Sequence, residues 1–214
     1  MPTRLDKSRR MNILAIGSHP DDIEFGCGGT LQKLTELGHR VYLLVMTDGS
    51  FGGKPSTRRK EQQTSADKLK AVDLFWGGHD DTRVPQSQQA IQGIEKIVTK
   101  VDPTFVFVHH GRDTHQDHRH TNENTVVATR NVPNVLFYEG PTTLDFAPHV
   151  FVDISHNITG KSACLSCHSS QVNKTNVRRQ SITDIARATA MFRGTQCRTT
   201  YAEAFMSLRM FIML

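Results

Sequence analysis

The sequence lacks any long hydrophobic run and has few cysteines. No apolar stretch approaches the roughly 20 residues that a membrane-spanning helix needs, which excludes an integral membrane protein. The 4 cysteines in 214 residues are too few for a disulfide-stapled scaffold, so we expect a reducing, cytoplasmic setting. The hydrophobic content of 37% is lean, but charges of both signs are mixed along the chain, which argues against wholesale disorder.

A secretory signal is also lacking. Residues 1–10 are basic, but the apolar run that follows them, 12–17, is short and soon gives way to polar residues. We therefore expect residues 1–10 to form a flexible basic N-terminus. The length suits one domain or at most two, and we expect residues 1–214 to be a single domain.

Acidic residues are scarce in the last part of the chain. From Ser155 to Leu214 there are 8 Lys and Arg against 2 Asp and Glu, whereas the rest of the chain carries 18 against 19. Such a basic segment could meet nucleic acid or an anionic partner. The positive residues are scattered and no nucleic-acid-binding motif accompanies them. We interpret them as a solvated helix face and do not expect a nucleic-acid partner.

The first half of the chain alternates between short buried strands and helices. Apolar runs of strand length predict four strands, and apolar spacings of three and four residues predict helices between them. The strands are 12–17, 41–47, 72–76 and 105–108, the helices are 26–37, 57–71 and 88–101, and residues 48–56 form a Gly-rich loop. This order predicts an α/β fold with a Rossmann-like, mostly parallel sheet and helices on both faces.

The second half gives weaker patterns, and we expect a more irregular C-terminal part of the same domain. Strand-like runs occur at 135–138 and 150–154, helical spacing at 159–169 and 182–192, and a loosely defined closing strand at 201–212.

Polar clusters follow three of the predicted strands directly, at 18–24, 48–59 and 109–120. Ligands of such sheets bind beyond the C-terminal ends of the strands, so these clusters should converge. The third cluster holds five His and two Asp within twelve residues. Imidazole and carboxylate groups are ligands of zinc and other first-row divalent metals. A lone His-Asp pair would be a helix cap or a surface ion pair, but two clusters on one sheet predict a metal site.

Two further motifs are incomplete or lack their context. The Gly-rich segment 26–30 follows a strand as in dinucleotide-binding sheets, but Leu31 stands where G-x-G-x-x-G requires its third glycine. We expect these glycines to let a helix pack closely instead. The segment 164–168 has the C-x-x-C-H spacing of c-type haem attachment, which requires export. We expect ordinary helix residues there.

The two polar clusters at 18–24 and 109–120 carry a family resemblance. His19-Pro20-Asp21-Asp22, followed by the Gly-rich segment, resembles the N-terminal motif of the LmbE-like (PIG-L) family of zinc-dependent N-deacetylases. His115-Gln116-Asp117-His118 resembles the second motif of that family, His-Pro-Asp-His. Weaker similarities continue in the family's order at 58–61, Asp81, 137–139, 152–154, Lys161, 168–171 and 201–205.

The resemblance implies a zinc site and a general base. It implies that His19, Asp22 and His118 bind the metal, and two His with one carboxylate leave a fourth position for water. It implies that Asp21 takes a proton from that water and later returns it to the leaving amine. Which of the two adjacent aspartates does which rests on the resemblance alone.

The resemblance also implies a role for the second motif. His115 would stand near the scissile carbonyl and, if protonated, would stabilise the oxyanion. Asp117 is its natural partner, which would orient His115 and keep it charged. Gln116 replaces the usual Pro, which removes no catalytic group. Arg112 and Asp113 stand in the loop where some family members have a Tyr, so a step that uses that Tyr has no counterpart here.

Asp81 and one of two neighbouring arginines, Arg58 or Arg59, resemble family positions that contact sugar hydroxyls. An Arg fork and a carboxylate can hold vicinal hydroxyls by hydrogen bonds. The alternative is an ion pair on the helix surface, because Arg58 and Glu61 are three residues apart. The loop at 48–53 is either a flexible wall or an ordinary turn.

The sequence therefore predicts a zinc-dependent hydrolase that removes the N-acetyl group from an N-acetylglucosamine-type amino-sugar conjugate. Other divalent metals share these ligands. The basic segment hints at an anionic aglycone, and the resemblance implies a homo-oligomer, a trimer or a hexamer. A different amide or ester hydrolase on the same metal site stays open, as does a metal-binding protein without catalysis. The intact Asp21 and the His115–Asp117 pair argue against the latter, because binding alone needs neither.

Overall fold

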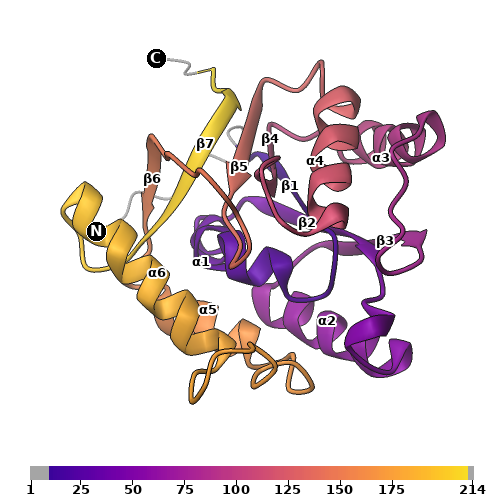
Figure 1. Cartoon of the computed structure of the whole chain (residues 1–214). Coiled ribbons are helices and arrows are strands. Elements are labelled where there is room, and N and C mark those ends of the chain that lie inside the picture. The colour runs from indigo at the N-terminus through magenta and orange to yellow at the C-terminus, as the bar shows by residue number, and fades with distance from the viewer. Residues whose placement is uncertain (1–9, 212–214) are drawn as a thin grey trace.

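The computed structural model describes residues 10–211, so the basic N-terminus predicted for residues 1–10 lies outside the described residues apart from Arg10. A seven-stranded sheet in the order β3-β2-β1-β4-β5-β7-β6 forms the centre of the molecule (Figure 1). The strands are β1 (Asn12–Gly17), β2 (Arg40–Thr47), β3 (Asp73–His79), β4 (Phe105–His109), β5 (Asn134–Tyr138), β6 (Val150–Asp153) and β7 (Ala202–Arg209).

The direction of the strands separates a regular part of the sheet from an irregular one. All neighbours from β3 to β5 pair in parallel, whereas β7 pairs antiparallel with both β5 and β6. The last strand of the chain thus inserts between β5 and β6. This arrangement confirms the mostly parallel α/β sheet and its more irregular C-terminal part.

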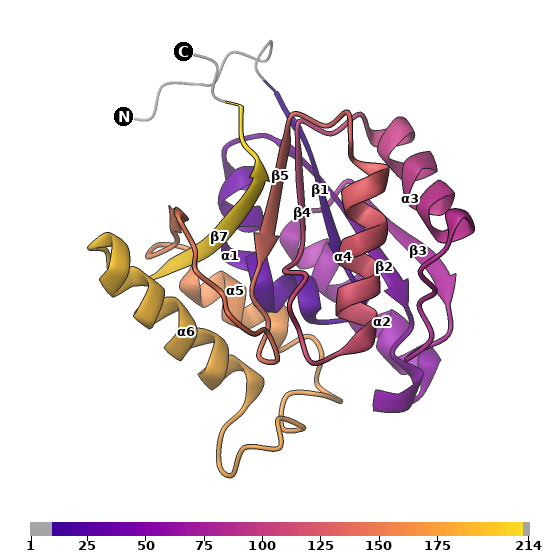
Figure 2. The ribbon, with the colours of Figure 1, turned by 45° about the horizontal axis from the view of Figure 1, so that its top comes forward.

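Helices cover both faces of the sheet. They are α1 (Asp22–Glu36), α2 (Pro55–Leu69), α3 (Gln88–Val101), α4 (Gln116–Ala128), α5 (Ile158–Leu165) and α6 (Ile182–Cys197), with a short 3-10 turn, η2 (Ser50–Gly52). Alternate residues of β1 enter two separate cores: Ile13 packs with residues of α1, α2 and α5, whereas Leu14 packs with residues of α3 and α4. Figure 2 shows α3 and α4 side by side on one face.

One helix was missed, and the bounds of several others differ from the prediction, most clearly the start of α1. The helix α4 was not predicted, because its sequence is mostly polar and has little apolar periodicity. The helix α1 begins at Asp22 rather than at residue 26. Its glycines lie within the predicted part of the helix and permit close packing, as expected. A Cβ at Gly26 would overlap the ring of Tyr138, and one at Gly29 would lie 2.8 Å from Ile154.

None of the helices within residues 10–211 combines the length and the apolar composition that crossing a bilayer requires.

Candidate metal centre

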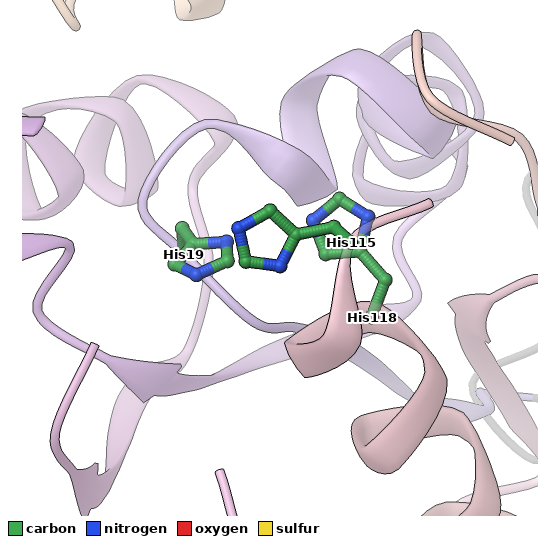
Figure 3. Close-up of side chains that lie close together, drawn as sticks. All are labelled: His19, His115 and His118. Carbon is green, nitrogen blue, oxygen red and sulfur yellow. The ribbon is translucent and has the colours of Figure 1, made fainter. Parts of the chain in front are cut away.

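The candidate metal centre lies where β1 and β4 end. The loop after β1 carries His19 and Asp22, and the segment after β4 leads to His115 and His118 at the start of α4. Because β1 and β4 are adjacent parallel strands, both segments leave the sheet at the same edge. Figure 3 shows the rings of His115 and His118, both from the start of α4, close to the ring of His19.

A tight turn gives the two adjacent aspartates different partners. Asp21 has a φ of 100°, in the left-handed region that costs a non-glycine residue about 1–3 kcal/mol. The Asp22 N–H donates to the His19 carbonyl, and the Asp22 Oδ2 accepts the His19 backbone N–H at 2.7 Å. This turn folds the Asp22 carboxylate back onto His19, while Asp21 contacts Arg58.

The three predicted metal ligands lie together. The Nδ1 atom of His19 is 3.2 Å from Asp22 Oδ2, and the Nε2 atom of His118 is 3.5 Å from Asp22 Oδ1. The rings of His19 and His118 are 5.5 Å apart between centroids. One nitrogen of each histidine therefore faces the same carboxylate.

Other carboxylates lie behind both histidines. The Nε2 atom of His19 is 3.1 Å from Asp117 Oδ2 and 3.1 Å from Asp81 Oδ1. The Nδ1 atom of His118 is 3.2 Å from Asp113 Oδ2. A carboxylate favours the proton on the nitrogen that faces it, which leaves the lone pair on the opposite nitrogen. Both nitrogens of each ring face carboxylates, so with Asp22 bound to a metal the outer carboxylates would hold the ring protons and leave the nitrogens beside Asp22 for the metal.

Two other histidines could compete for a metal on distance alone. Within residues 10–211, three groups place one ligand atom of each member within 4.8 Å of the others: His19, His115 and His118; Asp22, His109 and His118; and His19, Asp81 and Asp117. The Nε2 atom of His109 accepts the backbone N–H of Ser18, and the Nδ1 atom of His115 accepts that of Asp117. A neutral imidazole has one lone pair, so neither ring has one left for a metal. The hydrogen bonds thus favour His19, Asp22 and His118.

The pKa shifts agree with a site built for a cation. Burial by itself lowers the pKa of His118, but the carboxylates of Asp22 and Asp113 raise it to about 9. The pKa of His19 is also well above its ordinary value, because the nearby carboxylates outweigh burial. Burial lowers the pKa of His109 to about 4, which keeps that ring neutral.

The predicted pairing of Asp117 with a protonated His115 requires correction. The Asp117 carboxylate contacts His19 and accepts the backbone N–H groups of Thr82 and Val84. Only its backbone N–H meets the His115 ring. Burial and the neighbouring histidines lower the pKa of His115. The ring of His115 is therefore neutral, with its proton on Nε2.

The predicted general base, Asp21, lies beside the candidate metal ligands. Its side chain is 23% exposed and caps no backbone N–H of α1, so the carboxylate remains open to a substrate. Burial raises the pKa of Asp21, and the guanidinium of Arg58 at 3.4 Å partly offsets this. The Asp21 N–H donates to Gln62, one helical turn after Arg58 on α2. These two residues of α2 support the strained turn.

The three predicted sugar-binding residues occupy different surroundings. Arg58 is buried and donates to Asp21 and to the Pro20 carbonyl. Arg59 is half-exposed and stacks on Trp76, 4.5 Å from the ring centroid. In the described part of the chain, Arg59 makes no contact with the histidine cluster.

Asp81 has protein partners on both carboxylate oxygens. Oδ1 lies beside His19, and Oδ2 accepts the Phe51 N–H at 2.7 Å. Phe51 belongs to η2, and the carbonyl of its neighbour Gly52 accepts hydrogen bonds from Gln171 and Lys174. Hydrogen bonds therefore hold the loop at 48–53 in place, and this loop supports Asp81. Sugar contacts by Arg58, Arg59 and Asp81 stay predictions.

Two residues that contact the candidate site were missed at the sequence level. Asp113 faces His118, and Gln62 links the Asp21 backbone to Glu24, which accepts from Gln62 at 2.7 Å. Asp113 did carry a signal, since it lies in the His-rich cluster two residues before His115. Gln62 carried none, because only the packing of α2 against the turn brings it there.

Comparison with known proteins agrees with this geometry. Residues 14–129 match the PIG-L family, described as GlcNAc-PI de-N-acetylase. The chain belongs to the PIG-L family. This match includes the turn at His19 and the start of α4, so both halves of the site lie within it. As a PIG-L protein, the chain is a hydrolase that acts on amide bonds.

Several PIG-L relatives cover most of the chain. An uncharacterized deacetylase from Escherichia coli, YaiS, is 36% identical over 175 residues, which cover 76% of this chain and 93% of the relative. A diacetylchitobiose deacetylase from Thermococcus kodakarensis is 30% identical over 185 residues, covering 74% and 69%. The solved structure of N,N'-diacetylchitobiose deacetylase from Pyrococcus horikoshii has a TM-score of 0.84 at 25% identity, covering 94% and 85%.

Proposed function

We propose that this chain is a metal-dependent N-deacetylase that releases acetate from an N-acetylglucosamine-type amino-sugar conjugate, with zinc as its metal. One observation carries the proposal. Nδ1 of His19 and Nε2 of His118 both face the carboxylate of Asp22. The partly exposed carboxylate of Asp21 belongs to the preceding residue.

His19 through Nδ1, Asp22, and His118 through Nε2 would hold the metal. The fit rests on the donor set: two imidazoles and one carboxylate, with Asp117 and Asp113 behind the two rings. A bound zinc ion supplies Lewis-acid polarisation of the carbonyl and lowers the pKa of a bound water to about 7.

Asp21 acts as the general base. Its raised pKa keeps the carboxylate basic enough to take a proton from the attacking water and acidic enough to return it to the leaving nitrogen. Its open carboxylate and strained backbone are features that pre-organised catalytic groups share. Arg58 and Gln62 hold it in place.

His115 donates a hydrogen bond to the carbonyl oxygen. The neutral ring carries its proton on Nε2, because Nδ1 accepts the Asp117 N–H. An N–H donor held in place by the helix start can stabilise the negative charge that builds on this oxygen. This role replaces the protonated His115 that the sequence predicted.

Relatives and surface charge support the substrate class. Two of the similar proteins are named for deacetylation of diacetylchitobiose, an N-acetylated amino sugar. Lys174 and Arg178 line a hollow of about 640 Å³ beside Gly52, next to the turn that supports Asp81. These cations suit an anionic aglycone.

We also propose that residues 1–214 form one deacetylase domain and that the protein is cytoplasmic and homo-oligomeric. The four cysteines are free thiols, which supports a reducing compartment. The trimer or hexamer rests on the family resemblance alone.

The test is release of free amine and acetate from a panel of N-acetylglucosamine conjugates, with Asp21→Asn protein as the control. The proposal predicts release from at least one conjugate and loss of release in the variant. Release from acetyl esters but from no amide would favour the different hydrolase. Metal binding without any hydrolysis would favour the metal-binding protein.

A further inference from the structure

The carboxylate of Asp113 is enclosed by hydrogen-bond donors. Its side chain has no exposed surface. Oδ1 accepts the backbone N–H of His115 at 2.8 Å and the hydroxyl of Thr142 at 2.7 Å. Oδ2 accepts the hydroxyl of Thr143 at 3.0 Å and lies 3.2 Å from Nδ1 of His118. Three hydrogen bonds thus hold the carboxylate, and the ring nitrogen of His118 lies beside its second oxygen.

These partners come from two segments far apart in sequence. His115 and His118 begin α4, whereas Thr142 and Thr143 lie between β5 and β6. Two backbone hydrogen bonds join the segments, from Thr114 N–H to the Thr142 carbonyl and from Leu144 N–H to the Arg112 carbonyl. Asp113 therefore sits in a short antiparallel pairing, which restricts its movement.

A carboxylate suits this position because it only accepts hydrogen bonds. An acceptor facing Nδ1 of His118 favours the proton on that nitrogen, so the lone pair of the neutral ring is on Nε2. The Nε2 atom is the one that faces Asp22. Both ring nitrogens face a carboxylate, but Asp22 is a candidate ligand and Asp113 is not. When Asp22 binds a metal, Asp113 is the carboxylate that remains to hold the ring proton.

We propose that Asp113 is a positioning residue of the metal site, which fixes the proton of His118 on Nδ1 and presents Nε2 to the metal. This inference rests on the proposed function, since it requires that His118 binds a metal. Asp113 acts through His118 and touches neither substrate nor metal.

Asp113→Asn separates hydrogen-bonding chemistry from shape. If the amide nitrogen of the Asn faces Nδ1 of His118, it donates there and favours the ring proton on Nε2. That tautomer cannot bind a metal through Nε2. If the amide nitrogen faces the other way, two donors face each other, because it lies against the backbone N–H of His115. Neither orientation satisfies all the donors, although the side chain keeps its size.

The first experiment measures zinc affinity of the purified protein by competition with a chromogenic chelator. Asp113→Asn should bind zinc about 10- to 100-fold more weakly, the range for lost partners of metal-binding histidines. Asp145→Asn is the matched control, because Asp145 is an exposed carboxylate in the neighbouring segment that pairs with Arg112. It should bind as the wild type does. Equal affinity of all three proteins overturns the inference.

The second experiment needs no variant and covers the case that Asp113→Asn does not fold. Long-range ¹H–¹⁵N spectra of the zinc-loaded wild type should show His118 bound through Nε2, with a proton on Nδ1 protected from exchange. Binding through Nδ1 overturns the inference. Failure of the wild type to bind zinc in either experiment contradicts the proposed zinc site itself, so the two failures are distinguishable.

Discussion

The Asp117 carboxylate lies 3.1 Å from Nε2 of His19, whereas the ring of His115 meets only the backbone N–H of Asp117. The sequence predicted that the Asp117 carboxylate keeps His115 protonated, but in the structure it orients His19 instead. His19 thus has the carboxylate partner that the proposed metal ligand needs, and the lowered pKa of His115 keeps its ring neutral. The two motifs of the site are therefore joined by a contact that runs from the second motif to the first.

His115 and His118 give a matched pair of variants on one helix start. His118→Ala should lose bound metal together with activity, because it removes a ligand. His115→Ala should keep its metal and lower kcat by about 10²–10³-fold, the range for loss of one oxyanion donor. Metal content and steady-state rates measure both effects. Loss of metal in His115→Ala would show that this ring is a ligand.

Asp21→Asn should abolish most activity without disturbing the turn. Asn tolerates the left-handed backbone that Asp21 adopts, so the fold should be preserved. Loss of the base should lower kcat by about 10²–10⁴-fold, and the metal content should not change. Asp22→Asn is the matched variant and should lose metal. Full activity of Asp21→Asn would rule out its role as the base.

Neighbouring arginines distinguish positioning from sugar binding. Arg58 donates to Asp21, so Arg58→Ala should lower kcat by roughly 10-fold, as expected for loss of a charge-assisted hydrogen bond. Arg59→Ala should leave kcat unchanged, because Arg59 stacks on Trp76. A rise in KM at constant kcat in Arg58→Ala would instead support the sugar contact predicted from the sequence.

Two helical glycines give opposite stability predictions. Gly26→Ala should destabilise the protein by about 1–3 kcal/mol, because its Cβ would overlap Tyr138, whose hydroxyl donates to the Ile16 carbonyl. Gly93→Ala should stabilise it by up to about 1 kcal/mol, because Gly93 lies in α3 with nothing within 4 Å of the added Cβ. Urea unfolding measures both. Equal effects would contradict the packing described for α1.

Much of the fold was predictable because it follows from burial. The strand β1 and the helix α3 have the predicted bounds. A short, mostly apolar run is typical of a buried strand, and a strong apolar stripe is typical of a helix packed on one face. The helix α4 was missed because its buried positions hold mostly polar residues. Asp117 and His118 of the candidate site are among them, so its inner face does not look like a core face.

The location of the site was also predictable, but the pairing within it was not. The rule that ligands bind at the carboxyl ends of parallel strands brought His19 and His118 together correctly. The partners of Asp117 and Arg58 depend on distances of about 3 Å between segments far apart in sequence. A pattern of residues gives no such distances, so those contacts required the structure.

Chelation tests the central claim most directly. Acetate release from the best N-acetylglucosamine conjugate should be measured before treatment with a chelator, after it, and after zinc is returned in stoichiometric amount. The account predicts loss of release on chelation and recovery with zinc in the wild type, with no recovery in His118→Ala. Undiminished release from protein shown to be metal-free would contradict the metal-dependent mechanism.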